Sequence, residues 1–599
     1  MKLLRAYFKR FLRHKPRLLA GVVAIPLSQM ADVAVTILVG QSIEKVRSSG
    51  THEWLTHTLL LMAGAAIAHA FFRFWQRWLV VVVSRRFEVE LKQELFDHLV
   101  RLDLSFHAKS RSGDLVSRLT ADVESLRMFL GPGLMYTLGA AVIVPISLGW
   151  LFSLNPLLSM SMLLPLLAVG VIMQRLTPRL HVHSTAVQES LADISHRAHE
   201  DFGGVRVVQG YHRQDSQAKR FERSSEQNRD HQIALGRARG WTHASIHGSF
   251  DLTFAVILIL GGLAAIDRSL PIGELFQFVD LTIKVFWPLI AVGWIAGMYP
   301  RAVASAKRVQ TLLDTRSALT SVPEEETSTQ ARAVPSKGSQ QSPTQTLAPS
   351  LNFAHVSYSY PDADSATLQD LSFDLPAGTS LGIVGPTGAG KTTLLLLMGR
   401  LIDPTLGAIT SNEVDLRAVP LAQVRRALGY VPQDSFLFSV TYADNIRFGT
   451  DRDIGPERLT DLIEQVAMTN EVKNFPKGIE TLVGERGVTL SGGQRQRTCI
   501  ARALARKPQI LILDDCLSAV DTDTEKTLLQ SLRKEGQGRS VVLAAHRLSS
   551  VAGCDQILVL DEAGAQADMG THEELVKRSG WYKQTWDHQQ RRAALGDDT

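Results

Sequence analysis

The stretch LSGGQRQR at residues 490–497 is the most informative part of this 599-residue chain. It follows a glycine-rich loop, GPTGAGKT at 385–392, and precedes an apolar run that ends in two acids, ILILDD at 510–515. A loop of the form GxxxxGKT directs backbone N–H groups toward phosphates, and the helix after it contributes the positive end of its dipole. The loop alone occurs in many unrelated phosphate-binding proteins, so the interpretation depends on the three motifs together.

Taken together, the motifs resemble those of the ATP-binding-cassette (ABC) superfamily. The loop has the context that a phosphate site requires, because the apolar run SLGIVG (380–385) leads into it and the helix-forming run TTLLLLMGRL follows its lysine. The segment TLVGERGVTLSGGQ (481–494) is similar to the form found in exporters. The resemblance covers nearly the whole chain and extends to the multidrug-resistance-like bacterial half-exporters that work as heterodimers.

The charge pattern indicates a membrane protein rather than one that binds nucleic acid. The formal net charge is +5, but the basic residues gather at the ends of apolar runs, which is the positive-inside pattern. We therefore expect membrane lipids, and no nucleic acid, around this chain. Neither CxxC nor metal-ligand spacing is present among the cysteines, so reduced thiols are expected at Cys499, Cys516 and Cys554.

The first 300 residues contain apolar runs long enough to cross a bilayer, which needs about 20 residues each. The apolar run after the basic N-terminus is too long for a signal peptide, so the N-terminus is expected to form an interfacial cytoplasmic helix. The polar segments at 84–129 and 179–244 are expected to be cytoplasmic helical extensions. The six candidate spans lie near 18–42, 57–83, 130–153, 156–178, 245–267 and 274–298.

The predicted fold is an α-helical transmembrane domain of six helices, similar to a type I ABC exporter, fused to an α/β P-loop ABC ATPase domain. With one cassette and one membrane set, the chain is expected to be a half-transporter that needs a second half-transporter. The resemblance implies the bacterial inner membrane, with the ATPase domain in the cytoplasm. The expected boundaries are 1–315 for the membrane domain, 316–349 for a flexible Ser/Thr/Gln/Pro-rich linker, 350–590 for the nucleotide-binding domain and 591–599 for a tail.

The resemblance implies roles in binding ATP and Mg²⁺ for the residues that match the family's motifs. Lys391 is expected to reach the β- and γ-phosphates, and Thr392 to offer its hydroxyl to Mg²⁺. Asp514, at the end of its strand, is expected to hold the same ion. The residues of the loop and helix start expected to contact ATP are Gly385, Pro386, Thr387, Gly388, Ala389, Gly390, Lys391, Thr392 and Thr393.

Three further positions match motifs that surround the nucleotide in this family. Gln433, in YVPQD, matches the residue that senses Mg²⁺ and the attacking water, and His546, in AAHRLS, matches the histidine that contacts the γ-phosphate. Tyr360, in VSYSYP, matches the aromatic side chain on which adenine stacks. A lone tyrosine or histidine at such a position is ordinarily structural, so these assignments depend on the whole set of motifs.

The signature residues are expected to act on the nucleotide of the second chain. In the family, two ATPase domains pair head to tail, and each signature closes over the ATP of its partner. The attraction comes from N–H groups and a helix N-terminus directed at phosphate charge. Asp521, in LSAVD, matches the loop that crosses this interface. The signature residues are Ser491, Gly492, Gly493 and Gln494.

Asp515 departs from the family's fully active pattern, in which a glutamate polarises the attacking water. Aspartate is one methylene shorter, or about 1.5 Å along a carbon–carbon bond. A displacement of that size can slow a reaction by roughly 100-fold. This chain is therefore expected to bind ATP at a slow site and to pair with a different chain that has the glutamate.

Two alternatives remain open from the sequence. A homodimeric lipid flippase would contain two Asp515 sites and need no other chain. A mainly ATP-gated regulatory or channel-like subunit would use ATP binding without a full cycle.

The sequence indicates least about the transported compound. Arg73 and Arg77 share one face of the second span, and Asp280 and Lys284 share one face of the sixth. Such residues at membrane depth either contact a small amphipathic or anionic substrate or form intramembrane pairs. Apolar side chains that fit hydrophobic drugs or lipids, or that only pack, are Phe71, Phe72, Trp75, Phe286 and Trp287.

Overall fold

A computed structural model of the chain describes residues 2–48, 53–319, 349–361, 363, 365–484, 487, 489–520, 522–534 and 538–594. The chain divides into two compact units. The helical unit comprises Met1–Arg101 and Arg111–Arg316, and the α/β unit comprises Leu102–Ser110 and Ser317–Thr599. Most of the predicted linker, at 320–348, and the end of the predicted tail, at 595–599, lie outside the described residues.

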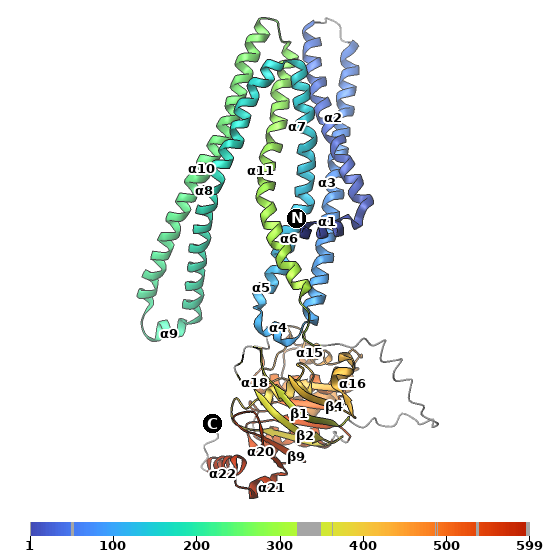
Figure 1. Cartoon of the computed structure of the whole chain (residues 1–599), viewed down its shortest axis with the longest axis vertical. Helices are drawn as coiled ribbons and strands as arrows, with labels where there is room; N and C mark the ends of the chain where they lie inside the picture. Colours follow the sequence, from blue (N-terminus) through green and yellow to red (C-terminus); the bar gives the residue numbers. More distant parts are fainter. Residues whose placement is uncertain are drawn as a thin grey trace, which may run out of the picture. The chain divides into compact units, whose positions relative to one another are not determined.

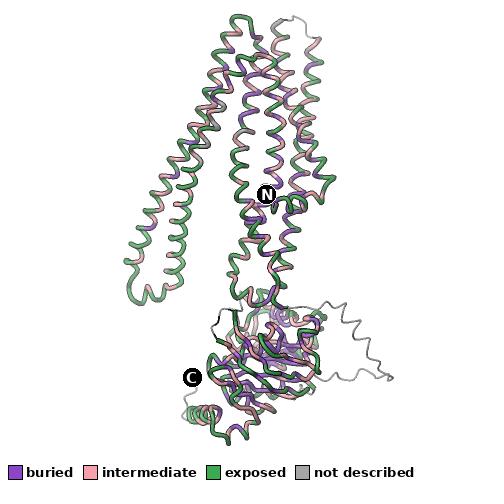
Figure 2. Tube along the Cα trace, viewed as in Figure 1, coloured by how far each residue is buried: buried purple, intermediate pink, exposed green. Residues whose placement is uncertain are grey.

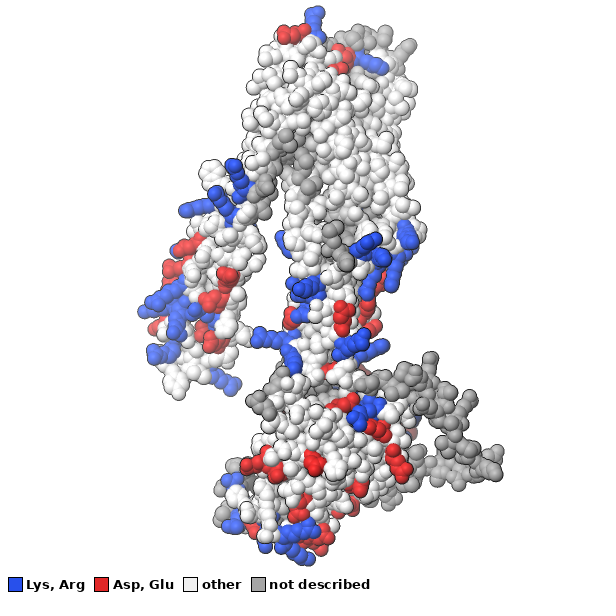
Figure 3. Space-filling model, viewed as in Figure 1, with Lys and Arg blue, Asp and Glu red and all other residues white. Residues whose placement is uncertain are grey.

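Six long helices occupy the positions of the six predicted spans in the described part of the helical unit. Five helical stretches there are long and apolar enough to cross a membrane, and a shorter apolar helix covers Pro156–Pro165 of the fourth. On the face drawn in Figure 3, a broad band with few charges separates the charged ends of this unit. The six helices are α2 (Lys15–Ser48), α3 (Glu53–Arg101), α7 (Leu134–Leu154), α8 (Pro156–Gly203), α10 (Gln214–Ile266) and α11 (Ile272–Asp314).

Shorter helices connect or brace these long ones. Figure 1 shows α8 and α10 side by side, joined through α9 (Val205–Gly210). The π-helical turns η2 and η3 lie before α7, and Asp122 in η2 accepts hydrogen bonds from Ser305 (2.9 Å) and Arg308 (2.8 Å) of α11. The bounds are η1 (Leu12–His14), α5 (Ser112–Ser117), η2 (Arg118–Asp122), α6 (Val123–Met128) and η3 (Phe129–Gly133).

The basic N-terminus forms a helix, α1 (Lys2–Phe11), as the sequence predicts. One set of its apolar residues is buried against protein, whereas Leu3 and Phe8 stay exposed. Tyr7 is 1% exposed and donates a hydrogen bond to Gln310 of α11 (3.1 Å). Phe11 is fully buried and meets the ring of Phe87 in α3, with 6.0 Å between ring centroids.

The α/β unit contains a four-stranded sheet, in the order β2-β1-β4-β5, and a six-stranded sheet, in the order β10-β9-β3-β8-β7-β6. Strands β6, β7, β8, β3 and β9 run parallel. Their apolar runs are buried because helices cover both faces of such a sheet. The strands are β1 (Leu351–Tyr358), β2 (Leu368–Leu375), β3 (Ser380–Val384), β4 (Leu406–Ser411), β5 (Val414–Asp415), β6 (Leu428–Val431), β7 (Ile510–Asp514), β8 (Ser540–Ala544), β9 (Gln556–Leu560) and β10 (Gln566–Gly570).

The helices of this unit complete its core, where Figure 2 shows buried residues concentrated along the strands. Among the described residues, Cys499, Cys516 and Cys554 form no disulfide. The helices are α13 (Lys391–Met398), η5 (Leu416–Ala418), α14 (Leu421–Ala427), α15 (Tyr442–Arg447), α16 (Pro456–Gln465), α17 (Thr469–Lys473), η6 (Gly478–Glu480), α18 (Gly492–Ala505), α19 (Thr522–Lys534), α20 (Leu548–Val551), α21 (His572–Lys577) and α22 (Trp581–Ala594).

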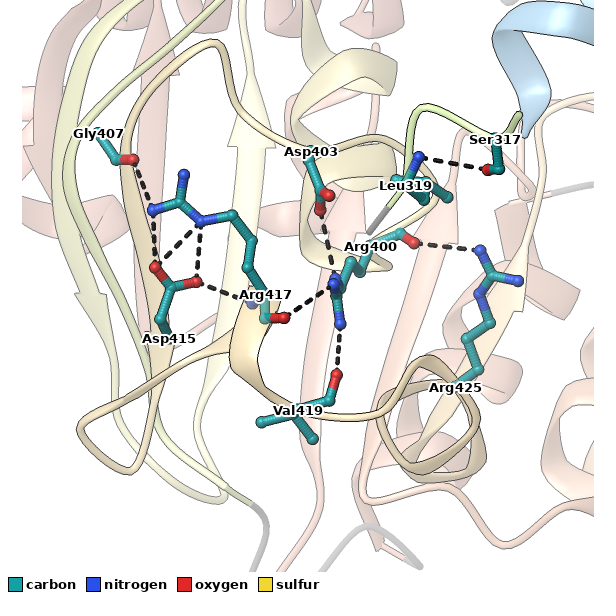
Figure 4. Close-up of polar contacts among 9 residues, drawn as sticks. All are labelled: Ser317, Leu319, Arg400, Asp403, Gly407, Asp415, Arg417, Val419 and Arg425. Atoms are coloured by element: carbon teal, nitrogen blue, oxygen red, sulfur yellow. Dashed lines mark hydrogen bonds and ion pairs between the residues drawn. The ribbon is translucent and has the colours of Figure 1, made fainter. Parts of the chain in front are cut away.

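A buried arginine anchors the chain just after α13 (Figure 4). Arg400 is 1% exposed and pairs with Asp403 at 3.3 Å. Its guanidinium also donates to the carbonyl oxygens of Arg417 (3.2 Å) and Val419. Buried charge is tolerated where its donors are satisfied, so Arg400 has a structural role in fixing the chain beyond α13.

One short helix, α4 (Leu104–Lys109), belongs to the α/β unit although it lies among the helical segments in sequence. Asp103 caps it by accepting from the N–H of Phe106 at 3.0 Å. The same carboxylate accepts from the N–H of Ala318 (2.6 Å) and the hydroxyl of Ser317 (3.3 Å). Although burial opposes ionisation, the hydrogen bonds to its carboxylate lower the pKa of Asp103 to about 2.

Candidate nucleotide site

The glycine-rich loop connects β3 to α13, so it lies between a buried strand and a helix N-terminus. Gly390 is the N-cap of α13 and has a φ of +85°, in the left-handed region. A Cβ at this position would lie 2.7 Å from Leu368 Cδ2 and 2.9 Å from the carbonyl oxygen of Thr367. Only glycine fits this backbone and this space, so the glycine of the motif is required by the turn itself.

The rest of the loop is folded tightly at its base and open at its tip. Ala389 is buried, and its N–H donates to the carbonyl oxygen of Pro386 at 3.2 Å. Thr387 and Gly388 at the tip are exposed. The loop therefore presents its tip to a ligand, as the phosphate-binding interpretation expects.

The side chain of Lys391 lies over the same loop. Its Nζ donates to the carbonyl oxygens of Gly385 and Pro386, both at 2.9 Å. Burial lowers the pKa of Lys391, and the carboxylates of Asp515 and Asp514 oppose that shift. The arrangement holds one cation at the loop, where a phosphate oxygen can replace the two carbonyls as acceptor.

Thr392 and Asp514 form the second polar pair of the site. The Thr392 hydroxyl donates to Asp514 Oδ1 at 3.2 Å. Asp514 is 2% exposed, and within the described residues its Oδ2 is buried with no hydrogen-bond partner. Burial raises the pKa of this carboxyl, against the hydrogen bond from Thr392.

This pair fits a hard divalent cation such as Mg²⁺, which prefers oxygen ligands and keeps several waters or phosphate oxygens. The orphaned oxygen of Asp514 is the observation that favours it. In the part of the chain that the structure describes, no group of three or more His, Cys, Asp or Glu side chains could hold a metal. A cation here therefore needs oxygens from water or from a bound phosphate to complete its shell.

The predicted catalytic residues follow neighbouring parallel strands at one edge of the six-stranded sheet. Asp515 comes directly after β7, and its N–H donates to the carbonyl oxygen of Ala544 at the end of β8 (2.9 Å). Gln433 follows the end of β6, the other neighbour of β7, and its side chain is exposed. The register of the sheet thus brings the ends of these strands together.

His546 lies just beyond β8 at the same edge, and a residue that the motifs do not include holds its backbone. Gln589 of α22 donates from Nε2 to the carbonyl oxygen of His546 (3.0 Å) and accepts from the N–H of Leu548 (2.9 Å). No local pattern in the sequence connects Gln589 with this loop, because the contact spans 43 positions.

Tyr360 lies beside the start of α13. Its hydroxyl and that of Thr393 are 3.2 Å apart, within hydrogen-bond distance. Its ring meets Tyr358 edge to face, with 5.0 Å between ring centroids, and the residue remains 39% exposed. An aromatic surface next to the loop is therefore free for stacking.

The signature segment forms the N-terminus of α18. Ser491 caps the helix, accepting from the N–H of Gln494 (3.2 Å), while the Gln494 side chain accepts from the N–H of Ser491 (3.0 Å). Gly493 is packed so closely that a Cβ would lie 2.8 Å from the carbonyl oxygen of Ala519. Among the described contacts, Ser491, Gly492, Gly493 and Gln494 make no hydrogen bond to the glycine-rich loop. Asp521 lies outside the described residues.

Comparisons with known proteins agree with this architecture. The family model described as "ABC transporter transmembrane region" matches residues 18–289, and the one described as "ABC transporter" matches residues 368–518. The chain is 31% identical over 604 residues to the multidrug resistance-like ATP-binding protein MdlA of Escherichia coli (strain K12), covering 99% of this chain and 97% of that protein.

Two further comparisons extend the likeness. The protein called "Probable multidrug resistance ABC transporter ATP-binding/permease protein YheI", of Bacillus subtilis (strain 168), is 31% identical over 504 residues, covering 84% of this chain and 82% of that protein. The solved structure of a bacterial Atm1-family ABC exporter with ATP bound matches with a TM-score of 0.76 and 26% identity, covering 96% of this chain and 98% of that one. The chain therefore belongs to the ABC transporters, as a membrane-spanning exporter half-transporter that is related to multidrug-resistance-like members and couples ATP hydrolysis to transport.

Proposed function

We propose that this half-exporter carries the slow ATP site of an asymmetric pair and moves amphipathic compounds, drugs or lipids, out of the bacterial cytoplasm or inner leaflet. ABC exporters work as dimers, either of two different half-transporters or of two copies. The observation that carries the proposal is Asp515, which stands where the active pattern has glutamate in a site that is otherwise complete. The multidrug names of two relatives support the cargo class.

In this proposal the residues of the glycine-rich loop hold ATP, and Tyr360 stacks on its adenine. Lys391 neutralises phosphate charge, while Thr392, Asp514 and Gln433 hold Mg²⁺, which supplies charge stabilisation for phosphoryl transfer. His546 contacts the terminal phosphate. The glycine-rich loop, Asp514, Gln433 and His546 lie at or just beyond the ends of strands of the six-stranded sheet, whereas Tyr360 follows β1 of the four-stranded sheet.

Asp515 is the weak point of the site. Its carboxylate is too short to orient a water molecule as a glutamate would, which makes hydrolysis slow without weakening ATP binding. Bound ATP then holds the two ATPase domains together for longer. ATP that binds the closed state more tightly than the open state shifts the equilibrium between them toward the closed state. The slow site therefore biases the transporter toward its closed form.

The signature has the opposite role in the pair. Ser491 and its helix N-terminus close over the partner's nucleotide, where a glutamate completes catalysis. An intact signature beside a weakened acid is the combination that an asymmetric pair needs. A homodimer would place an Asp515 in both of its sites.

The first test measures Mg-ATP hydrolysis by this chain alone, reconstituted in lipid. Wild-type turnover should be near zero and should rise by roughly 100-fold in Asp515→Glu. Asp453→Glu, the same change at an exposed position away from the site, serves as the control. Robust turnover by the wild-type chain, with no gain from Asp515→Glu, would favour a self-sufficient homodimer.

A second test compares two variants in the assembled pair. Ser491→Ala should lower ATP turnover more than Asp515→Ala, because it disables the partner's fast site while Asp515→Ala weakens a site that is already slow. ATP turnover of the purified pair is the measurement. The reverse order of severity would contradict the asymmetric scheme.

A further inference from the structure

A cavity of about 270 Å³ lies within the helical unit, between α2, α3, α7 and α11. Three cationic side chains line it, Arg73 and Arg77 of α3 and Lys284 of α11, together with the acid Asp32 of α2. Met135, Tyr136, Ile143 and Trp287 supply apolar and aromatic surface. A cavity with this lining, at the depth of the apolar spans, is a candidate binding site.

Arg73 is oriented by a histidine that carries no charge. Its Nη1 donates to His69 Nε2 at 3.3 Å, and His69 Nδ1 lies 3.0 Å from the carbonyl oxygen of Ser28. A guanidinium only donates and a carbonyl only accepts, so Nε2 accepts and Nδ1 carries the proton. His69 therefore takes one of the five N–H groups of Arg73 and adds no second charge.

Arg77 lies one helical turn further along α3 and lines the same cavity. Among the described residues, no carboxylate lies within 4.0 Å of either arginine, and Arg77 makes no hydrogen bond or ion pair. Gln76, between them in sequence, has a buried Oε1 with no partner. Both arginines are exposed, and ionisable residues at membrane depth typically face the bundle interior or a water-filled cavity, so their donors are open to a ligand in this cavity.

Lys284, in contrast, is already paired. Its Nζ lies 2.9 Å from a carboxylate oxygen of Asp32 and 3.2 Å from one of Asp280, and it donates to the Thr36 hydroxyl at 2.7 Å. Thr36 in turn donates to Asp280. These two acids are therefore held by the lysine on the α2 and α11 side, and the guanidinium groups on the α3 side remain available.

The aromatic residues of α3 and α11 that the sequence offers as cargo contacts lie in different surroundings. Phe71, Phe72 and Trp75 line a different, apolar groove between α2 and α3. Phe286 is buried and packs against Phe250, with 4.3 Å between ring centroids, so it has a packing role. Trp287 is the member of the predicted aromatic set that lines the charged cavity.

We propose that Arg73 and Arg77 bind the acidic headgroup, a carboxylate or a phosphate, of the compound that this exporter moves. The inference rests on the proposed export function and specifies its substrate class. Two guanidinium groups match the oxygens of such a headgroup by bidentate hydrogen bonding. The cavity is slightly smaller than the roughly 300–1,000 Å³ of whole small-molecule sites, so it takes the headgroup and leaves the apolar tail outside.

The test measures equilibrium binding to the full-length chain in nanodiscs of zwitterionic lipid, without nucleotide. Three radiolabelled probes share one tail length: dodecanoate, dodecyl phosphate and dodecyltrimethylammonium. At least one of the two acidic probes should bind more tightly than the cation. Arg73→Gln and Arg77→Gln should each weaken that binding by roughly 10-fold or more.

Two variants serve as controls. Arg86→Gln removes an exposed arginine from the same helix outside the cavity and should bind the acidic probe as the wild type does. Arg77→Lys keeps the charge but loses the fork of donors, so it should fall between wild type and Arg77→Gln. Equal binding by Arg73→Gln, Arg77→Gln and Arg86→Gln would overturn the proposal, as would tighter binding of the cation.

A competition experiment distinguishes a membrane lipid from a soluble compound as the source of the headgroup. Phosphatidic acid added to the nanodisc lipid should displace the acidic probe if the site takes a membrane lipid. Binding of the probe without such displacement assigns the site to a soluble acidic amphiphile.

A separate flux assay in sealed vesicles keeps the two proposals distinguishable. Arginine-dependent binding without ATP-driven flux would contradict the proposed export function but support the proposed binding site. ATP-driven flux that is unchanged in Arg73→Gln and Arg77→Gln would contradict the proposed binding site but support the proposed export function.

Discussion

The two units of this protein assemble their polar sites in different ways. In the α/β unit, Asp514 ends β7, Asp515 follows it, and His546 lies just beyond the adjacent strand β8, so the register of the six-stranded sheet brings them together. In the helical unit, the Lys284 side chain reaches the carboxylate and the carbonyl oxygen of Asp32 on a separate helix, 252 positions away. The first kind of site is built by backbone hydrogen bonds, and the second by packing and charge.

This difference separates the roles of the two lysines, Lys391 and Lys284. Lys391 lies over a loop whose own carbonyls are its only described partners, so its charge is available for a ligand. Lys284 is held by two carboxylates and a hydroxyl, so its charge is already neutralised within the protein. We therefore expect removal of Lys284 to affect folding and removal of Lys391 to affect binding.

The largest expected effect is on stability, from Lys284→Met. The change leaves Asp32 and Asp280 without their cation, and breaking a buried ion pair costs several kcal/mol. The group is only partly enclosed, since the three side chains are 18–31% exposed. We expect the free energy of unfolding to fall by about 2–4 kcal/mol, measured by denaturant titration of the purified chain in detergent.

The control for this prediction is Lys307→Met, at an exposed position on the same helix. Adding Asp280→Asn to Lys284→Met should recover part of the loss, because one unpaired charge is removed. Equal stability of the two lysine variants would mean that packing alone holds α2 against α11.

A smaller effect, confined to the ligand, is expected from Lys391→Ala. Loss of a hydrogen bond to a charged phosphate corresponds to about 1.5–3 kcal/mol, or roughly 10- to 150-fold weaker ATP binding. A fluorescent ATP analogue titrated against the full chain measures it, with Lys577→Ala, an exposed lysine in α21, as the control. Unchanged affinity would exclude Lys391 as a phosphate ligand.

The same contrast explains what could be predicted from the sequence. Strands β3 and β7, the glycine-rich loop and the six long helices lie where the sequence predicts them, because short-range periodicity and turn chemistry specify them. The shared face of Asp280 and Lys284 also follows from helical spacing. The intramembrane pair that the sequence left as an alternative is present there.

Contacts between distant segments could not be predicted in this way. Nothing near Asp32 indicates that it meets Lys284, because the contact depends on how two helices pack. Asp103 likewise reads as an ordinary N-cap, and its bonds to Ser317 and Ala318 become visible only in the folded α/β unit. Gln589 is the corresponding case at the nucleotide site.

Gln589 provides the smallest and sharpest test, because it is a side-chain contact within the backbone-built site. Gln589→Ala removes both hydrogen bonds to the loop of His546, a change of about 1–2 kcal/mol. Hydrogen exchange at the amide of Leu548, which Gln589 accepts from, should then be roughly 5- to 30-fold faster. Gln584→Ala, an exposed residue on the same helix, should leave that amide unchanged. If Gln589→Ala also left the exchange rate of Leu548 unchanged, the sheet alone would hold His546 in place, without help from distant side chains.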